Sequence, residues 1–465
     1  MSFLIVLAAL GFLMAVAYRG YSVILFAPVA ALGAVALTEP RLVAPVFTGV
    51  YMDKLAGFLK LYLPVFVLGA VFGKVIELSG FSQSIVASVL TLVGPERAIL
   101  SVVLVCAVLT YGGVSLFVVV FAVYPFAAEL FRRGDIPKRL LPGAIALGAF
   151  SFTMDAVPGT PQIQNIIPTA FFGTTAYAAP WLGAVGSVFI LGAGLAYLDW
   201  RRRRAKAAGE GYGANPLNEP EPFERGPLPH PLVAVLPLIL VGVLNKVFSV
   251  AIPAWYGPSV SFTPAAVGAS APVVQDVSKV AALWAMEGAL LVGILSVFVL
   301  AWRPVVSRFA AGSKSAVAGA MLAALNTASE YGFGAVVATL PGFLALAAAL
   351  AAVPGPLVNE AVTVTALAGI TGSASGGLSI ALAGLADTFI ANANQAGIPM
   401  EVCHRVASMA SGGMDTLPHN GAVITLLAVT GLTHRQAYGP IFAITVIKTA
   451  AVGVVIAVFH LTGIV

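Results

Sequence analysis

The sequence contains very little charge. Only 9% of its 465 residues are Asp, Glu, Lys or Arg, whereas 59% are hydrophobic. A soluble globular domain carries about 25% charged residues, so this chain lacks the charge that would cover a surface in contact with water. The composition therefore excludes a soluble enzyme or a soluble binding domain and predicts an integral membrane protein.

Cysteines and the common motifs of cofactor chemistry are scarce as well. The two cysteines, Cys106 and Cys403, lie far apart in apolar or helical stretches, which predicts neither a disulfide framework nor a cysteine metal site. The five histidines show no HExxH spacing, and the chain contains no Walker-type phosphate loop. We therefore expect no metal, no cofactor and no ATPase domain.

The sequence does contain a series of apolar runs, among them residues 180–198, 280–300 and 441–460. Runs of about 17–22 residues cross ~30 Å of hydrocarbon when they are helical. The pattern predicts an all-α polytopic membrane protein with about ten spans. Because the chain starts in apolar sequence without a basic segment or a small-residue cleavage site, we interpret residues 3–18 as a retained first span.

Basic residues gather in a few loops between these runs. The clusters are Arg132, Arg133, Lys138 and Arg139; Arg201, Arg202, Arg203, Arg204 and Lys206; and Arg303, Arg308 and Lys314. The positive-inside rule places all three in the cytoplasm, which explains the net charge of +5 without a nucleic-acid partner. The predicted segments are N-terminal helices (1–56), a first repeat (57–198), a cytoplasmic linker (199–230), a connecting helix pair (231–314) and a second repeat (315–465).

Two apolar stretches do not fit simple spans. Residues 98–131 are interrupted at Gly112 and Gly113 and have basic residues at both ends, which predicts a re-entrant hairpin. Residues 140–172 are interrupted by a Pro-Gly-Thr-Pro sequence, which predicts a broken helix because proline lacks a backbone donor and clashes with the preceding turn. Non-helical backbone at membrane depth is tolerated in a protein interior or beside a water-filled cavity. Both breaks therefore indicate a site.

The same features recur in the second half of the chain. The stretch from Gly112, GGVSLFVVVFAVYPFAAEL, resembles the stretch from Gly376, GGLSIALAGLADTFIANAN. Farther along, Met154-Asp155-x-x-Pro matches Met414-Asp415-x-x-Pro. The positions of the basic residues predict that the two repeats are inverted, with the second hairpin at residues 357–391. Inverted repeats with broken elements are typical of secondary transporters, whose site lies at the repeat interface.

These motifs also resemble a known family. GTPQIQN, at residues 159–165, is similar to the helix break of the ion transporter superfamily. SGGMDTLPHNGAVITLL, at residues 411–427, resembles the gluconate permease (GntP) family of proton symporters, and within it the members that transport D-3-hydroxybutyrate. The resemblance implies proton coupling, a homodimer, elevator-like movement of a substrate domain, and a location in the bacterial inner (plasma) membrane.

Each break creates a half-helix whose N-terminus faces the membrane centre. Such ends carry unpaired N–H groups and about +0.5 of an elementary charge, so they favour an anion. We expect four, starting after Gly113, Thr160, Gly377 and Asn420. The candidate substrate-binding residues all lie at or beside a break; they are Gly112, Gly113, Ser115, Thr160, Gln162, Asn165, Ser375, Gly376, Gly377, Ser379, His419 and Asn420. The alternative for the hydroxyl and amide side chains is capping alone.

Candidates for the coupling ion are Asp155, Asp415 and His419. A carboxylate near the midplane costs about 2.5–3.5 kcal/mol on insertion scales, and a histidine titrates near neutral pH. The alternatives are a structural role for each aspartate on unwound backbone and a neutral, hydrogen-bonded histidine.

Several further polar residues have two interpretations. Glu77 and Glu330 lie near predicted span ends, which favours snorkelling or capping at the interface. Lys448 either snorkels or pairs with a carboxylate. Asn326, Thr327 and Gln162 either line a cavity or form hydrogen bonds between helices.

The sequence thus predicts a secondary transporter, not an enzyme: a proton symporter that imports a small hydroxylated organic anion such as 3-hydroxybutyrate or gluconate. One alternative is a sodium-coupled di- or tricarboxylate carrier of the same superfamily, because unwound carbonyls beside Asp and Thr also suit Na⁺. A channel would need a repeated filter or rings of like charge. A membrane-embedded enzyme would have Asp155 and Asp415 as its only candidate dyad.

Overall fold

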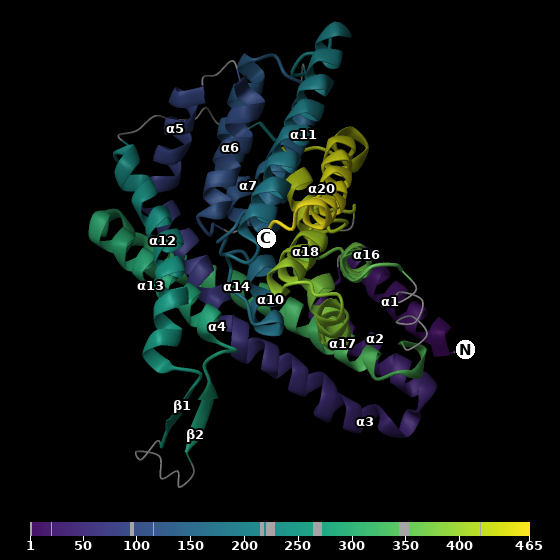
Figure 1. Ribbon diagram of the computed structural model, residues 1–465. Coiled ribbons are helices and arrows are strands. Elements are labelled where there is room, and N and C mark those ends of the chain that lie inside the picture. Colours follow the sequence, from purple (N-terminus) through teal and green to yellow (C-terminus); the bar gives the residue numbers. More distant parts are fainter. Residues whose placement is uncertain are drawn as a thin grey trace.

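The computed structural model describes residues 2–19, 21–93, 97–114, 116–213, 218–219, 228–263, 272–343, 353–418 and 420–465. Nearly all regular structure in these ranges is helical (Figure 1). The exception is one antiparallel pair of short strands, β1 (Ser259–Phe262) and β2 (Val273–Asp276), in the connection between the two helices predicted within residues 231–314.

Six helical stretches in the described part of the chain are long and apolar enough to cross a membrane. They are Pro40–Leu78, Pro180–Ala207, Pro231–Tyr256, Ala281–Leu300, Ala374–Gln395 and His434–Thr462. Shorter apolar helices accompany them, and the half-helices of a broken span are necessarily short. The prediction of a polytopic all-α membrane protein is confirmed.

The first part of the chain forms helices of which α2 and α4 pack against α14 (Trp302–Ala338). Their bounds are α1 Ser2–Tyr18, α2 Val23–Thr38, η1 Pro40–Leu42, α3 Val43–Val46, η2 Phe47–Met52, α4 Asp53–Leu78 and α5 Phe81–Val93. The stretch from η1 to α4 is almost continuous, and its π-helical part (η2) was not predicted. The helix α5 was not predicted either, because its serines and Gln83 lower the hydropathy of that segment.

Two series of elements then follow the same order of hairpin, broken helix and long helix. The first series is α6 Ala98–Tyr111, α7 Leu116–Arg133, η4 Lys138–Leu140, α8 Leu141–Ala149, α9 Phe152–Asp155, α10 Ile163–Phe172 and α11 Pro180–Ala207. The second is α16 Pro356–Thr371, α17 Ala374–Gln395, α18 Met400–Ser411, α19 Gly421–Thr430 and α20 His434–Thr462. Between them lie α12 Pro231–Tyr256, α13 Ala281–Leu300 and α14 Trp302–Ala338.

Charged residues proved poor markers of where helices end. The linker was expected to begin at residue 199, yet α11 continues to Ala207, with Arg202 and Arg203 paired to Asp199 one turn earlier. Likewise α14 begins at Trp302 and contains the third basic cluster, Arg303, Arg308 and Lys314, which was expected between apolar runs. A basic residue stops a helix from being apolar but not from being helical, since Lys and Arg have good helix propensity.

The helix α14 occupies a central position and positions the site. It packs against α4, α2 and α17, and small residues allow the closest approaches. A Cβ at Gly334 would lie 2.7 Å from the Cα atom of Ile380 in α17. Such close packing of small residues is typical of membrane helices. It buries the second half of α14 against the second hairpin, while α11 and α20 lie side by side (Figure 1).

Candidate functional site

A polar cavity of about 460 Å³ lies where the broken elements meet. All four predicted half-helices contribute to its lining, through Leu116 (α7), Gln164 (α10), Ser375 (α17) and Asn420 (α19). Its volume is typical of small-molecule sites, which occupy about 300–1,000 Å³. The cavity therefore collects half-helix starts that are more than 300 residues apart at the extremes, from Leu116 to Asn420.

The helices α17 and α19 begin with the same type of cap. The Ser373 hydroxyl accepts a hydrogen bond from the Gly376 N–H at 3.0 Å, and the Asn420 carboxamide accepts one from the Val423 N–H at 2.9 Å. Both caps satisfy the third N–H of their helix. The first two N–H groups of an α-helix have no intrahelical partner, and here they belong to residues that line the cavity: Ala374 and Ser375, and Gly421 and Ala422.

A second contact fastens each broken helix to its hairpin. The Asn420 side-chain amide donates to the Gly372 carbonyl at 2.8 Å. In the first series the Gln162 amide, at the N-cap of α10, donates to the Thr110 carbonyl at 2.7 Å. In both series an N-cap amide thus holds the end of the hairpin's first arm, which is the structural counterpart of the sequence repeat. Of the two interpretations of Gln162, interhelical hydrogen bonding is the one that the structure shows.

The first break is closed by packing. The Tyr111 hydroxyl donates to the Pro158 carbonyl at 3.1 Å. Gly113 has a φ of +86°, and a Cβ there would touch Phe72 and Pro161 at 3.4 Å. A Cβ at Gly112 would overlap Leu238 of α12. Both glycines therefore serve a tight, packed turn, and neither lines the cavity.

Thr160 and Asn165 are also occupied by internal contacts. The Thr160 hydroxyl donates to the Thr153 carbonyl at 2.7 Å, and the Asn165 amide donates to the carbonyls of Thr160 and Ala176 at 2.9 Å. Thr160 was expected at an N-cap, but α10 begins later and its N-cap is Gln162. The Thr160 carbonyl, which would accept the first backbone hydrogen bond of a helix capped by Thr160, is bonded by the Asn165 side-chain amide instead.

The second hairpin breaks earlier than predicted. We expected its second arm to start after Gly377, yet α16 ends at Thr371 and α17 starts at Ala374. Gly376 and Gly377 lie inside α17, where a Cβ would overlap Glu330 and the Ala368 backbone, respectively. These glycines allow close packing rather than leaving amides bare. Ser379 is fully buried and does not line the cavity.

The predicted aspartates lie in one buried region with a lysine. The Asp415 carboxylate lines the cavity and pairs with Lys448 at 2.5 Å. The Lys448 ammonium also donates to the Phe150 carbonyl at 2.9 Å, so of its two predicted roles pairing is observed. Asp155 does not line the cavity; its carboxylate abuts Gly412, and its Oδ1 atom has no hydrogen-bond partner among the described residues.

Arg405 is a buried residue of the site that was not predicted from the sequence. This side chain is fully buried in α18 and donates to the Asp155 carbonyl at 2.8 Å, the Ala178 carbonyl at 2.8 Å and the Asn165 side-chain oxygen at 3.0 Å. It therefore fills the unwound backbone of the first break from the second series. Its position between apolar residues of a predicted broken helix was a signal that could have identified it.

Glu77 and Glu330 proved to be different from each other. Glu77 is partly exposed near the end of α4 and pairs with Lys74 at 2.7 Å, as an interfacial residue would. Glu330 is only 3% exposed and lines the cavity, so its predicted interfacial role was wrong. Asn326 lines the cavity as well, whereas the Thr327 hydroxyl lies 3.2 Å from that of Ser375.

Two predicted site residues, Ser115 and His419, lie outside the described residues. Of the other predicted site residues, Ser375, Asn420 and Asp415 line the cavity. Within the described ranges no three His, Cys, Asp or Glu side chains are grouped closely enough to hold a metal ion.

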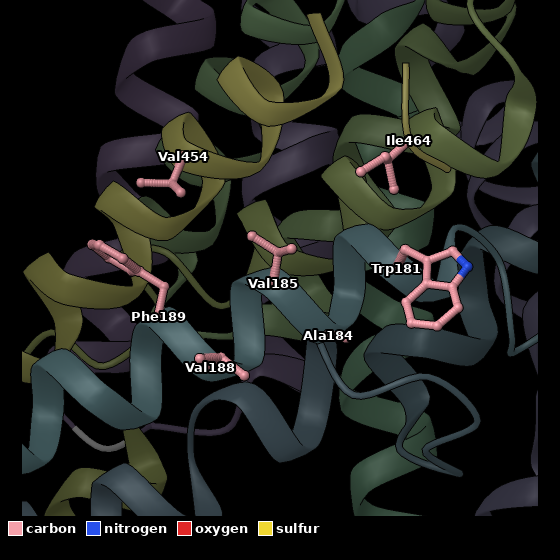
Figure 2. A pocket seen from close by; sticks show the side chains of 7 residues that line it. All are labelled: Trp181, Ala184, Val185, Val188, Phe189, Val454 and Ile464. Carbon is pink, nitrogen blue, oxygen red and sulfur yellow. The ribbon is translucent and has the colours of Figure 1, made fainter. Parts of the chain in front are cut away.

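A larger hollow of about 790 Å³ lies between α11 and α20 (Figure 2). Its lining consists of Trp181, Ala184, Val185, Val188, Phe189, Val454 and Ile464. Trp181 and Val188 are 69% and 72% exposed, so the hollow opens at the surface. Because the described lining is apolar apart from the Trp181 indole N–H, the hollow does not suit a small polar solute.

Comparison with known proteins agrees with a transport function. No protein-family model matches the chain. Two solved transporter structures are similar: YdaH of Alcanivorax borkumensis (15% identity, TM-score 0.45, covering 89% of this chain and 88% of that one) and the antimetabolite efflux pump MtrF of Neisseria gonorrhoeae (16%, 0.48, 88% and 82%). The chain is 56% identical over 475 residues, 100% of both lengths, to "Uncharacterized transporter YxjC" of Bacillus subtilis (strain 168). A multi-pass membrane protein so similar to YxjC along its whole length belongs to the same family of transporters.

Proposed function

We propose that this transporter is a proton symporter of the gluconate permease type that imports a small hydroxylated organic anion, such as 3-hydroxybutyrate or gluconate, across the bacterial inner membrane. The main support is the pair of matched caps on α17 and α19. Their open N–H groups belong to residues that line one cavity, and two such helix ends favour an anion without a Lys or Arg in contact with it.

The other groups of the cavity suit a hydroxylated substrate. Ser375, Asn326 and Gln164 offer hydroxyl and amide groups, and the buried Oε1 atom of Gln164 has no hydrogen-bond partner in the described structure. A buried polar atom without a partner costs about 1–3 kcal/mol, which a substrate hydroxyl would recover. Since Asp415 is paired with Lys448, that pair adds no net charge against an anion.

The mechanism that we propose is alternating access. The hairpins and broken helices would move as one substrate domain, as an elevator, in a homodimer with inverted repeats. Proton coupling would occur at the carboxylates of the region, where Asp155, Asp415 and His419 are the candidates. Ser375 and Asn420 are the proposed substrate-binding residues among those singled out in the sequence.

Residue 421 allows a direct test of the helix-end hypothesis. A Cβ at Gly421 has open space, and Asn420 has the extended ψ of 131° that a following proline requires. Gly421→Ala and Gly421→Pro both add a Cβ, but only proline removes the first N–H of α19. We expect Gly421→Ala to bind substrate normally and Gly421→Pro to bind about tenfold or more weakly, since a hydrogen bond to a charged group contributes about 1.5–3 kcal/mol.

Binding would be measured as thermal stabilisation of the purified protein by a panel of carboxylates, because a ligand of the folded state raises its apparent stability. Uptake into proteoliposomes would be driven by an inward proton gradient without Na⁺. Equal binding by the two variants would contradict the helix-end site. Uptake that needs Na⁺ and is insensitive to protonophores would contradict proton coupling.

A further inference from the structure

Glu330 lies in an unusual position for a carboxyl group. It is in the second half of α14, 3% exposed, and it lines the cavity. Its Oε2 atom is buried and has no hydrogen-bond partner among the described residues. The other carboxylate of the cavity, Asp415, is paired with Lys448 at 2.5 Å. Glu330 is therefore the acidic group of this lining for which the described residues provide no cation.

The Glu330 carboxyl is packed onto the first turn of α17. A Cβ at Gly376 would overlap this carboxyl, so only a hydrogen atom separates the helix from it. The hydroxyl of Ser373, the N-cap of α17, lies beside it. Glu330 thus occupies the same helix end whose first two N–H groups, at Ala374 and Ser375, belong to the cavity wall.

Two negative charges would compete at this helix end. An ionised Glu330 would offset the positive potential at the α17 N-terminus, which an anionic substrate needs. It would also repel that substrate within the cavity. A buried charge without a partner is also strongly unfavourable. When Glu330 carries a proton, it is neutral and can donate a hydrogen bond, and the helix end is available to the anion.

We propose that Glu330 accepts the coupling proton, so that one proton on its carboxyl and one anion at the α17 N-terminus bind together and leave together. This inference rests on the proposed anion–proton symport and assigns its proton to α14 rather than to Asp155, Asp415 or His419. The proton comes from the outer solution through the cavity and is released with the anion on the other side. The Asp415–Lys448 pair then remains a neutral pair throughout the cycle.

Few of the elements around Glu330 carry another titratable group that faces it. Tyr51 of η2 interacts with it electrostatically, Tyr21 lines the same cavity before α2, and Asp415 lines it with Lys448 behind. The remaining charged groups on the elements packed against α14 are exposed or partly exposed; they are Glu39, Asp53, Lys54, Lys60, Lys74, Glu77, Glu287 and Asp387.

The test compares Glu330→Gln with Glu360→Gln, which changes another fully buried glutamate, in α16, that does not line the cavity. If proton and anion bind together, the apparent Kd of the native protein for 3-hydroxybutyrate should rise about tenfold per pH unit above the range where Glu330 ionises. We expect Glu330→Gln to bind with a pH-independent Kd, to exchange substrate across proteoliposomes, and to lose proton-driven accumulation. Glu360→Gln should keep the native pH dependence.

The outcomes separate the two proposals. Proton-driven accumulation by Glu330→Gln with the native pH profile would overturn the role of Glu330 and leave symport intact. Native protein that transports without pH dependence, or only with Na⁺, would overturn symport itself. If Glu330→Gln does not fold, carbodiimide labelling of the native protein replaces it: Glu330 should be modified faster at low pH, and absence of labelling at any pH would overturn the proposal.

Discussion

The two series of broken elements have the same backbone plan and different uses. In each, the N-cap amide of the broken helix holds the end of the hairpin's first arm, through Gln162 in one and Asn420 in the other. Yet the turn at Gly112 and Gly113 is covered by side chains from distant helices, whereas the starts of α17 and α19 open onto the cavity. A repeat can therefore preserve its geometry while one copy packs its hairpin turn and the other opens that turn onto the cavity.

Basic side chains explain much of the difference between the two breaks. Arg405 precedes Met414 by nine residues, and the residue nine before Met154 is Ile145. Arg405 reaches across to fill the first break, and Ile145 has no polar group with which to make the reciprocal contact. The glutamates diverge similarly: Glu77 pairs with Lys74 near the surface, while Glu330 lies in the cavity. One buried guanidinium thus fills the first break, whereas the second break lines the cavity.

The largest expected effect concerns the inversion of the two repeats, because a residue at each hairpin base is either labelled from outside the cell or not. Inversion predicts that the base of the first hairpin is cytoplasmic and that of the second is outside. Arg133 and Gln395 are exposed at these bases, and the native cysteines, Cys106 and Cys403, are buried, so they should react little. In intact cells an impermeant thiol reagent should label Gln395→Cys and leave Arg133→Cys unlabelled. Labelling of both, or of Arg133→Cys alone, would refute the inversion.

The next largest effect is expected from substituting Arg405. Arg405→Met keeps an apolar stem but removes the guanidinium from the carbonyls of Asp155 and Ala178; the Ser408 hydroxyl still donates to Asp155, whereas Ala178 is left without a donor. An unsatisfied buried group costs about 1–3 kcal/mol, and a hydrogen bond from a charged donor contributes about 1.5–3 kcal/mol, so we expect a loss of about 3 kcal/mol in the free energy of unfolding. Arg435→Met, at an exposed site, is the control. Thermal unfolding in detergent measures both, and equal midpoints would show that Arg405 does not hold the first break.

The smallest expected effect is a difference in substrate affinity between substitutions of two serines in one helix. Ser375 and Ser379 both lie in α17, but Ser375 lines the cavity and Ser379 is buried away from it. Ser375→Ala should weaken substrate binding by about 1 kcal/mol, or roughly fivefold, because one hydrogen bond is lost. Ser379→Ala should leave the Kd unchanged. A greater loss of affinity from Ser379→Ala would mean that the substrate lies elsewhere along α17.

The sequence by itself determined the class of protein and the existence of the breaks. Apolar length requires spanning helices, and proline within a span removes a hydrogen bond wherever the chain folds. It also indicated Asp415, Ser375 and Asn420, since polar groups beside a break in an apolar chain are rarely accidental. These conclusions depend on local sterics and on solvation by lipid, which neighbouring sequence suffices to specify.

Only the tertiary structure decided which break is open and where its walls lie. Leu238 covers Gly112, Arg405 fills the first break, and α14 places Glu330 against Gly376, each from a segment far away in the chain. The contact between Gly376 and α14 also joins segments that are far apart in the chain. This is why the sequence did not show that the second hairpin breaks at Gly372 and Ser373 rather than at Gly376 and Gly377. A glycine's sequence context does not distinguish a turn from a packing contact, because the difference lies in the atoms that another helix brings to it.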